Sequence, residues 1–194
     1  VMADNSNDKT FPPGKPQYTL DFTYHGGIYR DVWMIAKNTV HITDAVEAGK
    51  VAGGGIFVHY NDMSADYVEV LVNTEVCNSG KTQRTVTVET TLLDINKKQS
   101  SKVSLDPGEA KTVVQKIKVK NPRLWSPETP YLYRLASRIK SGKTSLDGGL
   151  TKIGIRGFEF KGEDGFWLNG KRYHQLVGAN RHQDFAYVGN AVPN

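Results

Sequence analysis

The run Tyr67-Val-Glu-Val-Leu-Val-Asn-Thr-Glu-Val-Cys-Asn78 is the stretch that decides the fold. Its apolar and polar residues alternate along twelve positions. One face of an extended chain would carry Val68, Val70, Val72 and Val76, and the other would carry Glu69, Asn73 and Glu75. Because successive side chains of a strand point to opposite faces, this period of two predicts a β-strand that packs on a single side.

The same alternation recurs further along the chain. It is present at Val86, Val88 and Leu92, at Val113, Ile117 and Val119, and at Tyr131, Tyr133, Leu135 and Ile139. Turn signals separate these runs: Asn78-Ser79-Gly80, Asp106-Pro107-Gly108, Ser141-Gly142 and Asp147-Gly148. No long stretch has a helical period. Several short strands between residues 44 and 155, spaced by such turns, predict an all-β fold with two antiparallel sheets packed as a sandwich.

The residues before this body are harder to place in a sheet. Residues 1–18 are polar and rich in proline and glycine, which predicts a long loop after a short opening strand. Residues 29–36 are apolar enough for a strand, and residues 40–43 predict another short extended piece. Gly53-Gly54-Gly55 lacks the lysine and hydroxyl residue of a phosphate-binding loop, so it predicts a flexible turn before a strand.

The composition is that of an ordinary globular protein, with 38% hydrophobic and 23% charged residues and a net charge of +5. Lys116, Lys118 and Lys120 alternate with apolar residues, so they predict the wet face of a strand and not a nucleic-acid surface. No apolar run is long enough to span a membrane. We therefore expect neither nucleic acid nor membrane as a partner.

Cys77 is the one cysteine of the sequence, which excludes an internal disulfide framework and a cysteine zinc site. It lies in the alternating run, where a small, partly buried side chain is the expectation. A nucleophilic role would require a nearby base, and the sequence does not place one.

A second informative stretch, Phe166–Asp184, predicts a hairpin that leads into a polar cluster. Asn169-Gly170 lies between two apolar-rich runs, and this pair favours a type I′ turn because both positions reach positive φ. The second arm runs through Leu176-Val177 into Asn180-Arg181-His182-Gln183-Asp184. A strand that ends in polar and ionisable groups is how many α/β enzymes position an active site.

This stretch resembles the segment that opens the catalytic (β/α)8 barrel of the family 2 glycoside hydrolases, the β-galactosidase and β-glucuronidase group. Two other segments resemble the same family in the same order. Gly26–Val32 is similar to the end of its sugar-binding jelly roll, and Leu124–Tyr133 is similar to part of its immunoglobulin-like sandwich. The resemblance implies three parts: residues 1–43 from a jelly roll, 44–155 as the immunoglobulin-like sandwich, and 156–194 as the start of an incomplete barrel.

The resemblance also implies a function. The parent would be a retaining β-glycosidase, β-galactosidase-like, acting on β-glycosides or oligosaccharides. Glycoside hydrolysis needs two carboxyl groups across the scissile bond, and the family's catalytic glutamates would lie beyond residue 194. We expect this chain to be inactive by itself and to hold the sugar-binding domain against the barrel. The alternative is a free-standing carbohydrate- or protein-binding β-sandwich module.

Substrate-binding residues follow from the resemblance, and they apply to the intact parent only. His182, with Asn180 and Arg181, matches the family's Asn-Arg-His motif beside the sugar. Asp21, six residues before Gly27, resembles a jelly-roll aspartate that reaches the barrel's site. The other interpretation is local: Arg181 pairs with Asp184, His182 caps a loop, and Asp21 satisfies nearby backbone. No residue of this chain is expected to be catalytic.

Five carboxyl residues lie near these motifs, but none is in a context that marks a catalytic acid or nucleophile: Glu128, Glu159, Glu163, Asp164 and Asp184. No metal site is expected, since His174, His182 and Asp184 lack zinc-site spacing. Magnesium or sodium would belong to the parent, which could be periplasmic or secreted. Trp125 could stack on a sugar, but an aromatic plug of the sandwich core is favoured. Without the barrel, five apolar residues would be partly uncovered: Phe158, Phe160, Phe166, Trp167 and Leu168. We therefore expect the C-terminal tail to fold back on the sandwich or to pair with another chain, that is, to self-associate.

Overall fold

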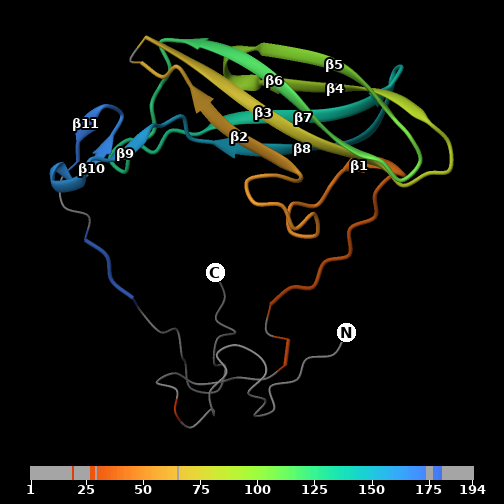
Figure 1. Ribbon diagram of the computed structural model, residues 1–194, viewed down its shortest axis with the longest axis horizontal. Helices are drawn as coiled ribbons and strands as arrows, with labels where there is room; N and C mark the ends of the chain where they lie inside the picture. The colour runs from red at the N-terminus through yellow and green to blue at the C-terminus, as the bar shows by residue number, and fades with distance from the viewer. Residues whose placement is uncertain (1–18, 20–26, 29, 65, 174–176, 181–194) are drawn as a thin grey trace. The chain divides into compact units, whose positions relative to one another are not determined.

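The computed structural model of the chain describes residues 19, 27–28, 30–64, 66–173 and 177–180 (Figure 1). Its contacts divide the chain into a larger unit, Ala36–Gln175, and a smaller unit made of Val1–Ile35 and Leu176–Asn194. Each unit is considered by itself. In the described part of the chain no helix is long and apolar enough to cross a membrane.

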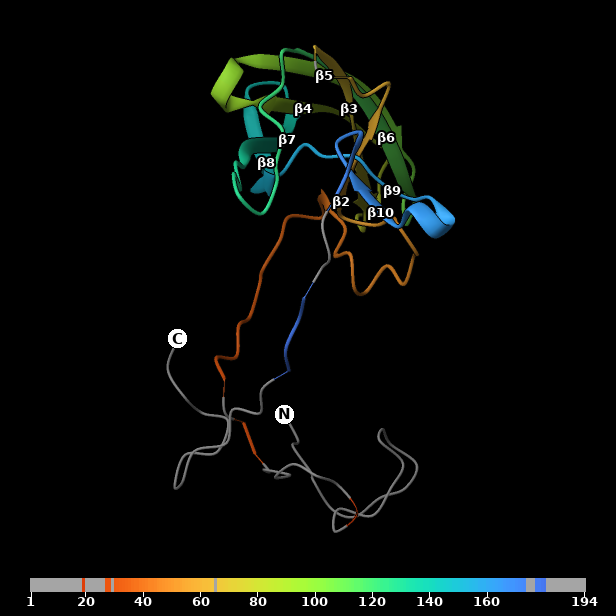
Figure 2. The same ribbon diagram turned by 90° about the vertical axis from the view of Figure 1, so that its left-hand side faces the viewer.

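The larger unit is an antiparallel β-sandwich, as the alternating runs predict (Figures 1 and 2). Sheet A has β3 as its central strand, paired with β6 on one side and with β2 and β1 in succession on the other. Sheet B has the strand order β5-β4-β7-β8. The strands of sheet A are β1 (Val40–Ile42), β2 (Ile56–Asn61), β3 (Tyr67–Asn78) and β6 (Ala110–Lys120); those of sheet B are β4 (Arg84–Leu92), β5 (Lys97–Leu105), β7 (Tyr133–Ser141) and β8 (Thr144–Ile153).

A small third sheet follows the sandwich. It has the order β11-β10-β9, with β9 at Phe158–Phe160, β10 at Phe166–Leu168 and β11 at Lys171–Arg172. Short 3₁₀ turns lie at Leu93–Ile95, between β4 and β5, and at Gly162–Asp164, between β9 and β10. The predicted hairpin is therefore present, with Asn169 and Gly170 at φ angles of 51° and 76° as a type I′ turn requires.

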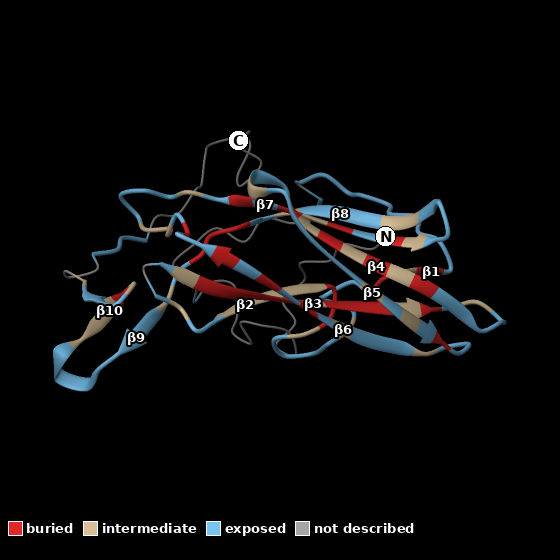
Figure 3. Cartoon of the chain, turned by 90° about the horizontal axis from the view of Figure 1, so that it is seen from above, coloured by how far each residue is buried: buried red, intermediate tan, exposed pale blue. Residues whose placement is uncertain are grey.

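The core of the sandwich consists of two apolar clusters. Figure 3 shows the buried residues along the strands of both sheets. Most members of the two clusters lie at the inward positions that the alternation predicts, and five others do not: Val40, Ile42, Leu105, Ile153 and Ile155. Cluster I contains Val68, Val70, Val72, Leu92, Ile117, Val119, Tyr133, Leu135, Ile153 and Ile155. Cluster II contains Val40, Ile42, Val76, Val86, Val88, Leu105 and Ile139. Each fully buried side chain of this size stabilises the fold by about 1.5–3 kcal/mol, before the cost of ordering it.

One part of the predicted strand arrangement is wrong. The predicted strand at residues 29–36 is absent from described residues 30–36, where Trp33 and Met34 are exposed. A strand needs a neighbour to pair its backbone groups, and no described strand pairs with this segment. The predicted short extended piece at residues 40–43 is present, since β1 pairs with β3 in sheet A. The predicted domain boundaries stay predictions.

The predicted turn at Asp147-Gly148 is also wrong, because both residues lie inside β8. A register shift beside Ile139 marks a bulge in the β7–β8 pair. A Cβ atom on Gly148 would lie 2.7 Å from the carbonyl oxygen of Ser137. Glycine is required here for close approach of two strands, and sequence alone does not distinguish this role from a turn.

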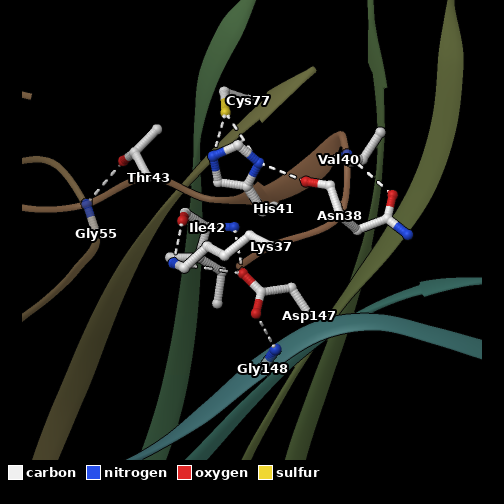
Figure 4. A network of polar contacts seen from close by, with 10 residues as sticks. All are labelled: Lys37, Asn38, Val40, His41, Ile42, Thr43, Gly55, Cys77, Asp147 and Gly148. Atoms are coloured by element: carbon white, nitrogen blue, oxygen red, sulfur yellow. Dashed lines mark hydrogen bonds and ion pairs between the residues drawn. The ribbon is translucent and has the colours of Figure 1, made fainter. Parts of the chain in front are cut away.

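Asp147 joins the two sheets. Its carboxylate accepts a hydrogen bond from the Ile42 backbone N–H at 2.8 Å, and the Lys37 ammonium lies 3.6 Å from the same oxygen (Figure 4). The bond connects β1 of sheet A with β8 of sheet B. A charge-assisted bond of this kind is stronger than one between neutral groups, so it fixes the edge at which the sheets meet.

Asn78 ends β3 and ties together two of the predicted turns. Its buried side-chain amide donates to the carbonyl oxygens of Thr82, Leu105 and Asp106 at 2.9–3.3 Å. Its Oδ1 accepts from the Gly80 N–H at 3.0 Å. One side chain therefore satisfies backbone groups of the turn after β3 and of the turn between β5 and β6.

We predict that Asn78→Asp lowers the free energy of unfolding by about 3 kcal/mol, because a carboxylate cannot donate to the buried carbonyl oxygens. Urea denaturation of the 194-residue chain measures this effect. Asn61→Asp, at the exposed end of β2, is the matched control and should change stability by less than about 0.5 kcal/mol. Equal effects of the two substitutions would contradict the assigned role.

Glu75 gives a second prediction, on pH dependence. Its buried carboxylate pairs with Lys50 and accepts from the Thr43 hydroxyl at 3.0 Å, and these bonds, Lys50 first, hold its pKa below the ordinary 4.5. A lowered pKa gives stability that is present above pH 4.5 and is lost as the pH falls through the folded-state value. Glu75→Gln should therefore flatten the loss of stability below pH 4.5, as measured by urea midpoints between pH 3 and 6.

Glu163→Gln, in the exposed 3₁₀ turn, is the control and should leave the shape of the pH curve unchanged. A Glu75→Gln curve parallel to that of the original chain would show that the ion pair does not contribute.

Candidate functional site

The substrate-binding residues predicted from the sequence are not brought together in the described structure. Asp21, Arg181 and His182 lie outside the described residues. Asn180 is described and exposed, and it belongs to the smaller unit. The sugar-binding role of these four residues therefore stays a prediction.

Asn169 connects the predicted hairpin to the sandwich, a role that the sequence did not reveal. Its Oδ1 accepts from the Gly157 N–H at 3.1 Å, and its Nδ2 donates to the Trp125 carbonyl at 3.0 Å. Its own backbone N–H donates to the Gly157 carbonyl at 2.8 Å. The Asn-Gly signal predicted the turn correctly, but these partners are 12 and 44 residues away, so only the fold could identify them.

Trp125 lies half-buried in the loop between β6 and β7, and other residues of the chain pack against its ring. The guanidinium of Arg156 lies 4.9 Å from the ring centre. A Cβ atom on Gly154 would come within 2.9 Å of ring atoms, so this position requires glycine. The Trp125 backbone N–H donates to the Ile155 carbonyl oxygen at 2.8 Å. These contacts support the plug interpretation over a sugar-stacking surface.

Tyr60 adds to the same joint from β2. Its hydroxyl donates to the Gly154 carbonyl at 2.9 Å, and burial raises the pKa of this hydroxyl to about 12. Tyr60 therefore remains a neutral hydrogen-bond donor across the physiological pH range. The segment that leaves the sandwich, residues 154–157, is thus held by Tyr60, Trp125 and Asn169.

Three pockets surround this joint. The first, of about 480 Å³, lies between β2 and the segment after β8, and Lys152 and Arg156 line it without any carboxyl group. The second, of about 270 Å³, includes Glu159. The third, of about 440 Å³, includes Glu128. None of the three is lined by two carboxyl groups, which glycoside hydrolysis requires.

The four candidate carboxyl groups that the structure describes are exposed, and two of them have a partner. Glu128 accepts from the Tyr173 hydroxyl at 2.6 Å, and Glu159 lies 3.3 Å from the Lys161 ammonium. Glu163 and Asp164 lie in the 3₁₀ turn, which buries no residue, and Asp184 lies outside the described residues. A catalytic acid needs a raised pKa. At five other described carboxyl groups, hydrogen bonds hold the pKa below its ordinary value: Asp44, Glu75, Glu89, Asp94 and Glu109.

The structure does place a base beside Cys77. His41 is its partner in the β1–β3 register, and the Cys77 Sγ lies 3.2 Å from the His41 Nε2 (Figure 4). The His41 Nδ1 lies 2.8 Å from the Asn38 carbonyl oxygen, which can only accept, so the proton is on Nδ1. Burial, however, raises the pKa of the Cys77 thiol. A nucleophile needs the thiolate, so this pair lacks the activation of a catalytic cysteine.

No cluster of three or more histidine, cysteine or acidic side chains that could bind a metal ion is present among the described residues. This leaves the expectation of magnesium or sodium in the parent as a prediction.

The aromatic face of the small sheet is the other feature near the joint. Phe158, Phe160 and Phe166 form an aromatic cluster in which every pair of ring centres lies 5.3–6.4 Å apart, and Tyr173 meets Phe166 edge-on at 5.9 Å. Phe158 is 60% exposed and Phe160 is 76% exposed. Leu168, which was expected to lack cover together with the phenylalanines, is buried.

Comparisons with known proteins agree with this arrangement. The chain is 32% identical to a β-galactosidase from Thermoanaerobacter pseudethanolicus. The match covers 100% of this chain and 24% of that protein. It is 30% identical to a β-glucuronidase from Formosa agariphila, over 85% of this chain and 17% of that protein. The chain thus spans a quarter or less of the length of these relatives.

Solved structures match over nearly the whole chain. A putative β-galactosidase from Bacteroides fragilis superposes with a TM-score of 0.80 at 28% identity, covering 98% of this chain and 28% of that one. A Bacteroides uniformis β-glucuronidase gives a TM-score of 0.78 at 31% identity, covering 98% and 22%. The family model for glycosyl hydrolases family 2 matches residues 54–156, more than half of the sequence. The chain therefore belongs to glycosyl hydrolases family 2.

Proposed function

We propose that this chain is the non-catalytic sandwich region of a retaining β-glycosidase, β-galactosidase-like in its substrate. In this proposal the sandwich holds the sugar-binding domain on one side and the catalytic domain on the other. The observation that carries it is the lack of a carboxyl pair around the three pockets, in a chain whose family hydrolyses glycosides. Retaining hydrolysis requires two carboxyl groups about 5 Å apart, one of them kept protonated.

The joint around Asn169 supports a positioning role. The segment that leaves the sandwich is fixed by hydrogen bonds to Tyr60, Trp125 and Asn169, so the hairpin after it is aimed by the sandwich and does not move as a free tail. Positional errors of about 1 Å between reacting groups can cost about 100-fold in rate. A rigid joint before the domain that carries the chemistry would limit such errors.

The exposed aromatic cluster indicates that another protein surface covers this end of the sandwich. A monomer rarely leaves neighbouring aromatic rings open to water, and such patches mark an interface. In the parent, we propose that residues of the catalytic domain cover Phe158 and Phe160. In the isolated chain, a second copy would cover them.

We predict that the purified chain does not hydrolyse nitrophenyl β-galactoside or nitrophenyl β-glucuronide above the uncatalysed rate. The physical reason is the missing pair of carboxyl groups. A chromogenic assay measures it, with the protein separated from host glycosidases by two orthogonal columns. Turnover that follows the protein peak through both columns would overturn the non-catalytic role.

Binding distinguishes the alternative module. Calorimetric titration with galactose, glucuronate and their β-linked oligosaccharides should give no heat of binding for a positioning region. A dissociation constant of about 1 mM or lower, worth about 4 kcal/mol, would favour a carbohydrate-binding module instead.

We also predict that the chain self-associates through the aromatic cluster. Sedimentation velocity should show a concentration-dependent dimer, and Phe158→Ser with Phe160→Ser should abolish it, because the two rings supply the exposed apolar area. Leu150→Ser is the matched control, since Leu150 is also 60% exposed but lies on β8 and is not part of the aromatic cluster. A dimer that persists in the double variant, or a wild-type monomer at all concentrations, would count against this surface.

A further inference from the structure

Four polar side chains lie inside the sandwich with their functional atoms fully enclosed. They are Thr74, Thr90, Gln115 and Ser137, and none is more than 3% exposed. They come from four strands, β3, β4, β6 and β7, so both sheets contribute. Polar residues of this kind are seldom buried unless their hydrogen bonds are satisfied.

The four residues lie at the boundary between the two apolar clusters. Along each strand, the inward position on one side of the polar residue packs in cluster I and the position on the other side packs in cluster II. The neighbours are Val72 and Val76 around Thr74, Leu92 and Val88 around Thr90, Ile117 and Val113 around Gln115, and Leu135 and Ile139 around Ser137. Thr90 and Ser137 are also direct partners in the β4–β7 register. The four side chains therefore form one polar layer across the core.

The layer keeps unused hydrogen-bonding capacity. The Gln115 amide donates to the Val88 carbonyl at 3.0 Å and lies 3.2 Å from the Ser101 hydroxyl oxygen, which fixes the side chain across the two sheets. Its Oε1 has no partner among the described residues, and neither do the hydroxyl oxygens of Thr74, Thr90 and Ser137. Each buried polar group left without a hydrogen-bond partner would lower the folding equilibrium constant about fivefold or more.

We propose that this polar layer is an internal binding site for water, in which at least one ordered molecule bridges the hydroxyls of Thr90 and Ser137 and the layer as a whole is hydrated. The ligand must be small, and it must both donate and accept. It must also be neutral, because the layer contains hydroxyls and one amide but no charged group. A water molecule typically makes about three hydrogen bonds, so one or two molecules satisfy four such atoms.

A metal cation does not fit the layer. The buried carboxylates of sheet A, Glu69 and Glu75, alternate with the inward valines of β3 and pair with Lys116 and Lys50 on the outer face. No described carboxylate is left to balance a cation inside the sandwich. The chemistry of the layer therefore selects water over an ion.

The hydrated layer has a consequence for strand register. A shift of β4 against β7 by two residues would keep every side chain on its face, so apolar burial alone opposes it weakly. It would, however, move the Thr90 hydroxyl away from Ser137 and into an apolar cluster, without water or partner. The layer thus distinguishes the correct register from the nearest alternative that preserves the alternation.

A high-resolution crystal structure of the 194-residue chain tests the site directly. The expected result is a water molecule within hydrogen-bonding distance of the Thr90 and Ser137 hydroxyls. A dry layer, with these hydroxyls turned to main-chain carbonyls, would overturn the proposal.

A double-mutant cycle tests the same bridge in solution, using Thr90→Val, Ser137→Ala and the double variant in urea denaturation. If one water molecule serves both hydroxyls, removing either hydroxyl removes much of the same interaction. The fold-loss in folding equilibrium constant of the double variant should therefore be at least threefold smaller than the product of the two single fold-losses. If the fold-change of the double variant equals the product of the two single fold-changes within about twofold, a shared water molecule is contradicted.

Thr87→Val provides the matched control. Thr87 is on the same strand at an outward position, and its combination with Ser137→Ala should be multiplicative. Coupling as large as that of Thr90 would show that the cycle measures strand pairing and not a shared water, and it would remove this support. Oxygen-17 relaxation dispersion should additionally show fewer long-lived waters in the Thr90→Val, Ser137→Ala variant than in the original chain; an equal number would also count against the site.

Discussion

The position of β3 is the constraint on which the rest of the structure depends. This strand is paired along its length with β6, and on its other side with β2 and then β1. Both of its faces are largely buried, with valines inward and Glu69 and Glu75 outward against lysines. A central strand leaves no backbone group for water, so its neighbours must supply every bond. The register of sheet A follows from that requirement.

The two sheets are then held together at separate points by polar side chains. Asp147 bridges β8 to β1 at one edge, Asn78 ties the turns at the end of β3, and Gln115 reaches from β6 to the backbone of β4. Apolar burial supplies most of the stability but is not directional. Hydrogen bonds between particular atoms select one arrangement of the sheets among several that would bury similar area.

The proposed positioning role of this region rests on the same division of roles. Its described pockets lack the pair of carboxyl groups that the family's chemistry requires, and its exit segment is fixed by Tyr60, Trp125 and Asn169. The Cys77–His41 pair has the distances of a nucleophile and base, yet burial raises the pKa of the thiol. Distance alone would therefore be a poor guide to catalysis here.

The sequence by itself determined the all-β class, the strand at Tyr67–Asn78 and the Asn169-Gly170 turn, because alternation and turn chemistry act between neighbouring residues. It also carried the family resemblance that the comparisons confirm. It missed the polar strand β5, and it placed a turn at Asp147-Gly148 where β8 runs on. The tertiary structure decided the sheet to which β1 belongs, the base beside Cys77 and the partners of Asn78, Asp147 and Asn169. Most of these contacts join residues 27 to 105 positions apart, and no local pattern encodes which distant group will lie within hydrogen-bonding distance of a side chain.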